Sequence, residues 1–115
     1  MPDAEGAQPT TDSVVASLAA AADAARQAYL AALAANPGAD LSKLYKYEMA
    51  ALSVWSDAEN KALNNDPAVQ AAQIALDKAT QTIRANLATL KDITQWVRLM
   101  DGLVNLATSV GKFLA

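Results

Sequence analysis

The pattern of hydrophobic and polar positions predicts a C-terminal helix with an unusually wide apolar face. Between Asp92 and Ala115, one row of apolar residues recurs at alternating spacings of four and three, and a second row recurs every seven residues beside it. A face this wide must be covered by the rest of the chain, by a second copy, by a partner or by a membrane. The first row is Trp96, Met100, Leu103, Ala107, Val110 and Leu114, and the second is Leu99, Leu106 and Phe113.

Three further segments have helical periodicity between strong stop and start signals. The first begins with Thr11 or Asp12 as its N-cap and ends at Asn36, before Pro37 and Gly38. The second follows Asp40 as its cap and runs to residues 64–65, and the third restarts at 66–67, an Asp-Pro pair. The predicted inward positions are Val15, Leu18, Ala22, Ala25, Tyr29 and Ala32 or Leu33 in the first segment, Leu41, Tyr45, Met49, Leu52, Trp55 and Ala62 or Leu63 in the second, and Val69, Ala72, Leu76, Thr80, Ile83, Leu87 and Leu90 in the third.

Two folds are consistent with the stretch from Pro67 to Phe113, in which no Gly or Pro follows Pro67 before Gly102. A turn between Thr89 and Asp92 gives four helices of similar length, and hence an all-α, antiparallel up-down four-helix bundle. Without that turn, the chain forms three helices, and residues 67–113 become one long C-terminal helix that dimerises to cover its second half. Equal helix lengths and self-coverage favour the four-helix bundle.

The domain organisation predicted from the same pattern is simple. Residues 1–10 combine prolines, a glycine and acidic residues without periodicity, so we expect a disordered N-terminal tail. Residues 11–115 are expected to form a single helical bundle domain. Alanine is abundant as far as Ala88, after which only Ala107 and Ala115 occur, so the last helix carries the bulky side chains and is the expected centre of packing.

Charge and composition exclude several classes of function. The net charge is −3, and the basic residues are scattered singly, whereas nucleic acids are bound through clustered positive charge. The same lack of basic clusters disfavours binding to an anionic membrane surface. The chain has no run of apolar residues long enough for a transmembrane helix and no secretory signal pattern. A cytoplasmic location is therefore the default expectation, and leaderless secretion is the alternative.

No constellation of residues predicts catalysis, a cofactor or a metal site. The chain has no histidine and no cysteine, and its carboxylates are dispersed. Phosphate-binding and calcium-binding motifs are absent, so we expect a protein that is not an enzyme. We expect Glu48, the carboxylate nearest an apolar face, to reach water or to meet Arg84 or Arg98, and we expect Asp57 and Lys61 to pair on an exposed helix face.

The over-wide C-terminal face leads to the functional prediction. We expect a non-catalytic module for protein–protein interaction or assembly, whose partner is another protein or a second copy of the chain. The alternative is a bundle that binds a membrane or an apolar ligand by exposing its C-terminal amphipathic helix. The candidate interaction surface comprises Trp96, Leu99, Leu103, Leu106, Val110 and Phe113.

Overall fold

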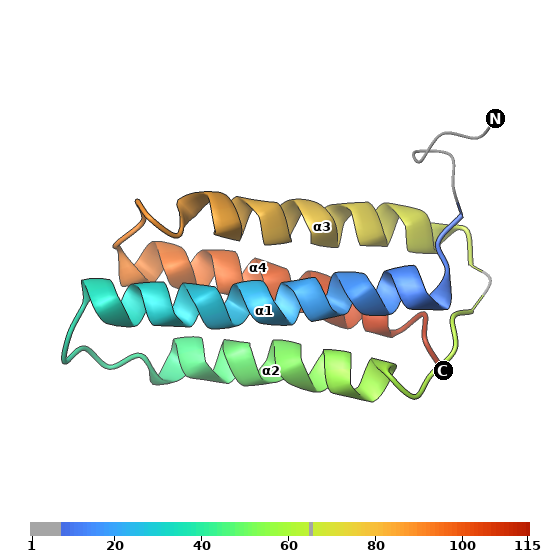
Figure 1. Ribbon diagram of the computed structural model, residues 1–115, viewed down its shortest axis with the longest axis horizontal. Coiled ribbons are helices and arrows are strands. Elements are labelled where there is room, and N and C mark those ends of the chain that lie inside the picture. Colours follow the sequence, from blue (N-terminus) through green and yellow to red (C-terminus); the bar gives the residue numbers. More distant parts are fainter. Residues whose placement is uncertain (1–7, 65) are drawn as a thin grey trace.

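The computed structural model describes residues 8–64 and 66–115 and shows a bundle of four α-helices (Figure 1). Most of the predicted tail, residues 1–7, lies outside the described residues. The all-α four-helix fold predicted from the sequence is confirmed. The helices are α1 (Thr11–Ala35), α2 (Ser42–Ala58), α3 (Ala68–Asn86) and α4 (Ile93–Gly111).

Successive helices run in opposite directions, but their order around the bundle is not their order in the chain (Figure 1). Helices α1 and α4 each pack against all three other helices. Helices α2 and α3 lie on opposite sides of this central pair, and no contact joins them within the described part of the chain. The corners of the bundle therefore follow the order α1, α2, α4, α3. This order makes α1 a central helix.

The alternative of one continuous helix over residues 67–113 is wrong, because α3 ends at Asn86 and α4 begins at Ile93. The turn contains no Gly or Pro, so side chains stabilise it. The amide nitrogen of Thr94 donates to Oδ1 of Asp92 over 2.8 Å, which makes Asp92 the N-cap of α4. Nε1 of Trp96 donates to the carbonyl oxygen of Leu90 over 3.1 Å. These two hydrogen bonds satisfy backbone groups that a continuous helix would have paired.

The predicted end of the second helix at residues 64–65 is also wrong, because α2 ends at Ala58. Residues 59–64 instead leave the α2 corner and lie along the end of the bundle, and the chain reaches the α3 corner at residues 66–67. On this path, Ala62 and Ala115 exchange two backbone hydrogen bonds of 2.9 Å, and Leu63 forms an isolated antiparallel bridge with Leu114. Backbone pairing with the C-terminus thus replaces the last helical turns that the sequence predicts.

The caps of α1 match the sequence pattern to within one residue. Thr10, rather than Thr11 or Asp12, is the N-cap, and it forms a reciprocal capping box with Ser13 through hydrogen bonds of 2.9 and 3.0 Å. At the other end, α1 stops before Asn36 as predicted. Gly38 has a φ of 81°, a left-handed conformation that glycine adopts without strain.

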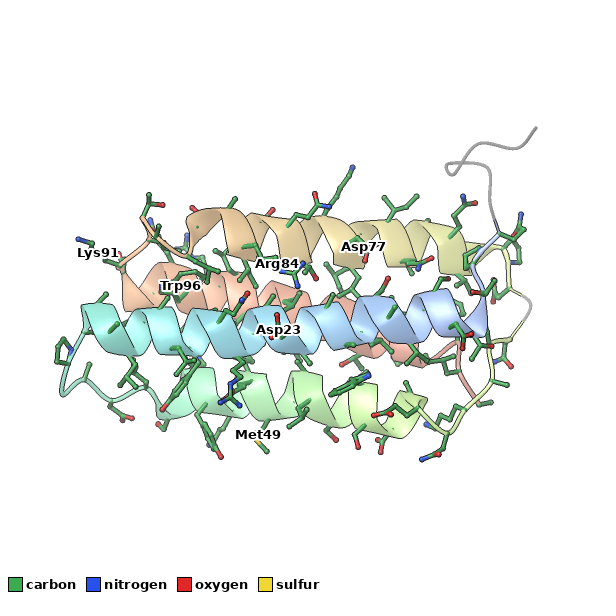
Figure 2. The ribbon with its side chains drawn as sticks, in the orientation of Figure 1. Asp23, Met49, Asp77, Arg84, Lys91 and Trp96 are labelled. Carbon is green, nitrogen blue, oxygen red and sulfur yellow. The ribbon has the colours of Figure 1, made fainter. Side chains whose placement is uncertain are left out.

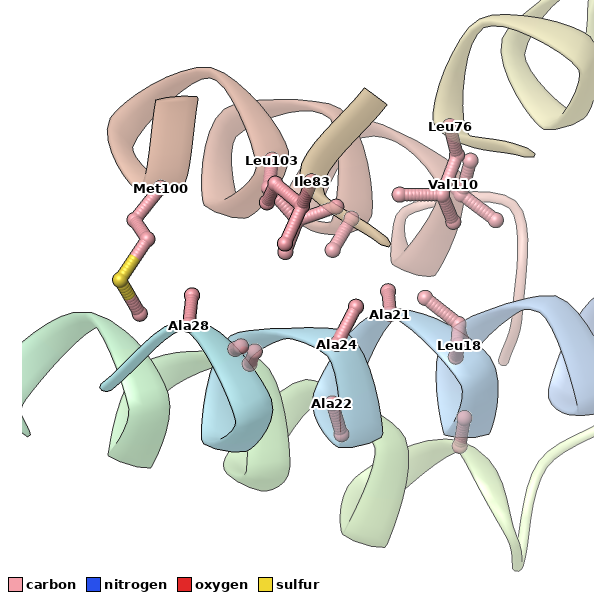
Figure 3. Packing of buried hydrophobic residues seen from close by; sticks show 14 of the residues in the cluster. Leu18, Ala21, Ala22, Ala24, Ala28, Leu76, Ile83, Met100, Leu103 and Val110 are labelled. Atoms are coloured by element: carbon pink, nitrogen blue, oxygen red, sulfur yellow. The ribbon is translucent and has the colours of Figure 1, made fainter. Parts of the chain in front are cut away.

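The alanines of α1 allow three helices to pack around it. Ala21, Ala24 and Ala28 are completely buried. In Figure 3 the larger side chains of α3 and α4, such as Ile83 and Leu103, lie opposite these alanines. A small residue on the central helix leaves room for a large one on its neighbour, so the helix axes can approach closely.

The core positions predicted for α4 are confirmed, and those predicted for the third segment are confirmed in part, because Ala72, Leu87 and Leu90 are only half-buried. All six residues of the first C-terminal row are buried, and Trp96 is the largest fully buried side chain of the described residues. In α3, Val69, Leu76, Thr80 and Ile83 are buried as predicted. The predicted α1 positions are partly confirmed: Leu18, Ala22, Ala25 and Ala32 are buried, Val15 and Tyr29 are half-buried, and Leu33 is exposed.

Candidate functional site

The six residues of the predicted interaction surface do not form an exposed patch. Trp96, Leu103 and Val110 are completely buried in the bundle core. Leu99, Leu106 and Phe113 are half-buried and pack against that core. The wide face of α4 is therefore covered largely by α1, α2 and α3, because α4 contacts all three of these helices.

Of the positions predicted to face inward in the second segment, Leu41 is buried and Trp55 is half-buried, but the three between them are exposed. Tyr45, Met49 and Leu52 are 49%, 43% and 39% exposed, and Figure 2 shows Met49 on the side of α2 that faces away from the other helices. The residues that α2 buries recur every seven positions, and they are Leu44, Ala51 and Ala58. Two apolar stripes therefore run along α2, and the stripe with the smaller residues lies against the bundle. Alanine is favoured there because the alanines of α1 bring the two helices close together.

Exposed apolar side chains concentrate on the first two helices. Of the six large hydrophobic residues that are exposed in the described part of the chain, three lie on α2 and two, Leu30 and Leu33, lie on α1. The sixth, Ile74, stands apart on α3 and is 50% exposed. We define the α1–α2 face as the exposed residues Leu33, Tyr45, Met49 and Leu52 together with the half-buried Tyr29 and Trp55.

Aromatic contact and a shallow hollow join the two helices across this face. The rings of Tyr29 and Tyr45 meet edge to face with their centroids 5.8 Å apart. Further along, a hollow of about 210 Å³ opens between α1 and α2. Ligand pockets usually measure about 300–1,000 Å³, so this open hollow suits one side chain of a partner better than a cofactor. It is lined by the apolar residues Ala19, Ala22, Leu52 and Trp55 and by the charged residues Asp23, Arg26 and Glu48.

The predicted partners of Glu48 were Arg84 or Arg98, and neither pairs with it. Glu48 is half-buried in the hollow, and Arg84 instead contacts Asp23 on α1, with its nitrogen 3.6 Å from the carboxylate oxygen. That ion pair is exposed to solvent and stabilises little. Arg26 and Glu48 line the hollow together, and neither forms an ion pair with any described residue.

The exposed charges of α2 are segregated along its length. Lys43 and Lys46 lie in its N-terminal half, and Asp57 and Glu59 lie at its C-terminal end. The predicted pair of Asp57 with Lys61 does not form, because α2 ends before Lys61. Lys61 and Lys112 do line a second hollow beside Asp57, without approaching to ion-pair distance.

Two groups on or next to α2 have perturbed pKa values. The backbone amide of Ser42 donates to Oδ1 of Asp40 over 3.0 Å, and this hydrogen bond, together with one from the Ser42 side chain, lowers the pKa of Asp40. Tyr47 Oη donates to Oδ1 of Asp101 on α4 over 3.1 Å. Burial and this carboxylate both raise the pKa of Tyr47. Both groups therefore support the position of α2, and neither forms a reactive pair.

Comparison of the chain with protein families, with curated proteins and with solved structures found no match. Within residues 8–64 and 66–115, no three potential metal-ligating side chains cluster together. None of the helices in this part of the chain is long and apolar enough to cross a membrane. The α1–α2 face is therefore the candidate functional site.

Sequence reasoning missed this face because it assigned the larger apolar residues of α2 to the core. A signal was present in the sequence. The stripe of Leu44, Ala51 and Ala58 has the same spacing of seven as the second row of the C-terminal helix. Because two of its three residues are alanines, this stripe is less hydrophobic than the neighbouring stripe of tyrosine, methionine and leucine, which was therefore predicted to face the core.

Proposed function

We propose that the protein is a non-catalytic helical module that associates with a protein partner through the α1–α2 face. One observation carries this proposal: four of the six large hydrophobic side chains that are exposed among the described residues belong to this face, and they are Leu33, Tyr45, Met49 and Leu52. Contiguous exposed apolar residues of this kind mark interaction sites on water-soluble domains.

The composition of the face supports association with protein. Tyrosine, tryptophan and methionine are enriched at the centres of protein interfaces, and the α1–α2 face contains Tyr29, Tyr45, Met49 and Trp55. Methionine adapts its shape to a partner, and the hollow beside Trp55 accepts a single inserted side chain. Arg26 and Glu48, which line that hollow, supply polar groups that would orient the partner.

The arrangement of polar groups supports binding rather than catalysis. The chain holds no histidine or cysteine to act as a base or a thiolate nucleophile. The carboxylates nearest the face, Asp23 and Glu48, line an open hollow, where water has free access. An open, solvated hollow does not exclude water from a reaction as an active site does.

The alternative, in which α4 is released onto a membrane or an apolar ligand, has weaker support. Its apolar face would have to leave the core, where Trp96, Leu103 and Val110 are completely buried. Exposing three such side chains costs roughly 1.5–3 kcal/mol for each. The α1–α2 face requires no such rearrangement.

The test is photo-crosslinking in the cells that make the protein. A photoreactive amino acid replaces Leu52 in the α1–α2 face and, as a matched control, Ile74 on α3, which is similarly exposed. We expect adducts with protein from position 52 and few from position 74. Met49→Asp should abolish the adducts from position 52 and leave the helix content unchanged, because Met49 is exposed. Equal adducts from both positions, or none from position 52, would overturn the proposal.

A further inference from the structure

We propose that the partner is a second copy of this chain, and that the two α2 helices pack antiparallel about a twofold axis that passes between Ala50 and Ala51. This inference rests on the proposed function and names the partner for the same face. Three features of α2 carry it: the order of its apolar residues, the segregation of its charges and the relation of those charges to the helix dipole.

The apolar stripe of α2 is complementary to itself when its direction is reversed. A twofold axis between residues 50 and 51 places Met49 of one copy opposite Leu52 of the other, and places Tyr45 opposite Ser56. Both pairs occur twice, as a twofold interface requires. The large ring of Tyr45 thus meets the small side chain of Ser56, while Met49 and Leu52, which have similar volumes, meet at the centre. Such matching of large with small residues fills an interface without voids.

The charges of α2 are also complementary under the same reversal. Lys43 and Lys46 of one helix lie along the end of the other helix that carries Asp57 and Glu59. All four side chains are exposed, and none forms an ion pair with another described residue. A parallel arrangement would instead place lysines over lysines and carboxylates over carboxylates. Charges on the flanks of paired helices select the orientation in this way.

The helix dipole adds an independent argument. The first turn of α2 carries Lys43 and no acidic residue, and the last turn carries Asp57 and no basic residue. A helix N-terminus is partly positive and a C-terminus partly negative, so both charges stand at the less favourable end of the isolated helix. An antiparallel second α2 brings opposite charges and an opposite dipole to each end. The placement that is unfavourable in one copy is therefore favourable in a pair.

The expected dimer is small and reversible. Helix α2 has 17 residues and is about 25 Å long, so the contact lies at the lower end of the usual range of roughly 1,200–2,000 Å² of buried surface. The aromatic residues at the α1 border, Tyr29 and Trp55, extend the contact toward α1. We therefore expect an equilibrium between monomer and dimer that depends on protein concentration.

The test is sedimentation equilibrium of the purified full chain over a concentration series. We expect a reversible dimer. The double variant K43E/K46E, which makes the exposed helix charges all acidic, and the double variant D57K/E59K, which makes them predominantly basic, should each weaken self-association about tenfold or more. Mixing the two variants should restore association, and so should the quadruple variant that carries all four changes.

Two controls address net charge and orientation. The double variant K78E/K91E, at two exposed lysines outside α2, lowers the net charge by the same amount as K43E/K46E and should leave the dimer intact. Because the chain has no cysteine, the variants Ser53→Cys and Ser42→Cys each carry a single thiol, to which one spin label per copy can be attached. In the antiparallel pair, the two copies of position 53 are about 8 Å apart along the helix axis, and those of position 42 about 25 Å apart. Equal separations at both positions would indicate a parallel pair and overturn the arrangement.

The outcomes separate this inference from the proposed function. A monomer at every concentration, together with crosslinks from position 52 to a different protein in cells, would overturn the second copy as partner and leave the α1–α2 face as the binding site. A dimer that neither charge reversal weakens would show that α2 is not at its centre. A monomer without crosslinks from position 52 would overturn both.

Discussion

The indole Nε1 of Trp96 donates a hydrogen bond to the carbonyl oxygen of Leu90 over 3.1 Å, across the turn that separates α3 from α4. Trp96 is completely buried, so its ring fills the core while its polar edge satisfies a backbone group of the turn. One side chain thus connects the packing of the core with the break between the two helices.

Replacing Trp96 with phenylalanine should destabilise the bundle by about 2–3 kcal/mol, because it leaves a cavity and an unpaired carbonyl at Leu90. The measurement is urea denaturation, followed by circular dichroism. Trp55→Phe provides the control. Trp55 is only half-buried, so this substitution should lower the free energy of unfolding by less than Trp96→Phe does. Equal losses for the two variants would contradict the central place assigned to Trp96.

Two glycines in α4 should respond differently to alanine. A Cβ at Gly102 would meet no atom within 4 Å, so Gly102→Ala should stabilise the protein by about 0.5–1 kcal/mol through the higher helix propensity of alanine. At Gly111 the added Cβ would lie 3.1 Å from Cγ1 of Val54 on α2. That tight contact should cancel most of the gain. Thermal unfolding of the two variants tests this, and an equal rise in Tm would show that α2 moves aside freely.

Thr80 carries a buried hydroxyl that forms no hydrogen bond with any described residue. The residue is 3% exposed, so water does not readily replace the missing partner. Thr80→Val keeps the shape and removes the polar atom, and we expect it to stabilise the bundle by about 1 kcal/mol. Chemical denaturation gives the value, and Thr80→Ser, which keeps the hydroxyl and loses a methyl group, should destabilise. A loss of stability in Thr80→Val would indicate that the hydroxyl is satisfied in solution.

The raised pKa of Tyr47 predicts a loss of stability in alkaline solution. Burial and the carboxylate of Asp101 favour the neutral phenol in the folded state, whereas the unfolded chain ionises near the ordinary value of 10.0. The stability contributed by Tyr47 is therefore complete below about pH 10 and is lost as the pH rises through the raised pKa. Tyr47→Phe should reduce the alkaline decline of the denaturation midpoint.

A second variant identifies the cause of that shift. Asp101→Asn keeps a hydrogen-bond acceptor for Tyr47 and removes the negative charge, so it should move the pKa of Tyr47 partly back toward its ordinary value. Absorbance titration of tyrosinate in the wild type and in this variant measures the change. An unchanged titration would show that burial alone, the largest cause, accounts for the raised pKa.

The parts of the fold that could be predicted are those in which the apolar pattern has strong contrast. In α4, bulky apolar residues recur at helical spacing with polar residues between them, and every residue of the predicted first row is buried. The turn before α4 was located from Asp92 and its neighbours, because a carboxylate at an N-cap satisfies free backbone amides. Local chemistry is sufficient in both cases, since the signal does not depend on which helix is the neighbour.

The candidate site could not be predicted, because α2 offers two apolar stripes of comparable length. Judged by side-chain size, the stripe of Tyr45, Met49 and Leu52 is the stronger candidate for the core, yet it is the exposed one. The stripe that is buried includes Ala51 and Ala58, and it suits the closely packed neighbours α1 and α4. The choice between the stripes depends on the shape of those neighbours.

By itself, then, the sequence determined the helical class, the buried row of α4 and the absence of histidine and cysteine chemistry, and it favoured four helices over three, because propensity, capping and residue identity act locally. The tertiary structure alone decided the order of the helices around the bundle, the early end of α2 and the exposure of the α1–α2 face. These features follow from packing between segments far apart in the chain. The small alanines of α1 allow the three other helices to pack closely against it. The larger apolar residues of α2 do not fit into this close contact and therefore lie on the surface.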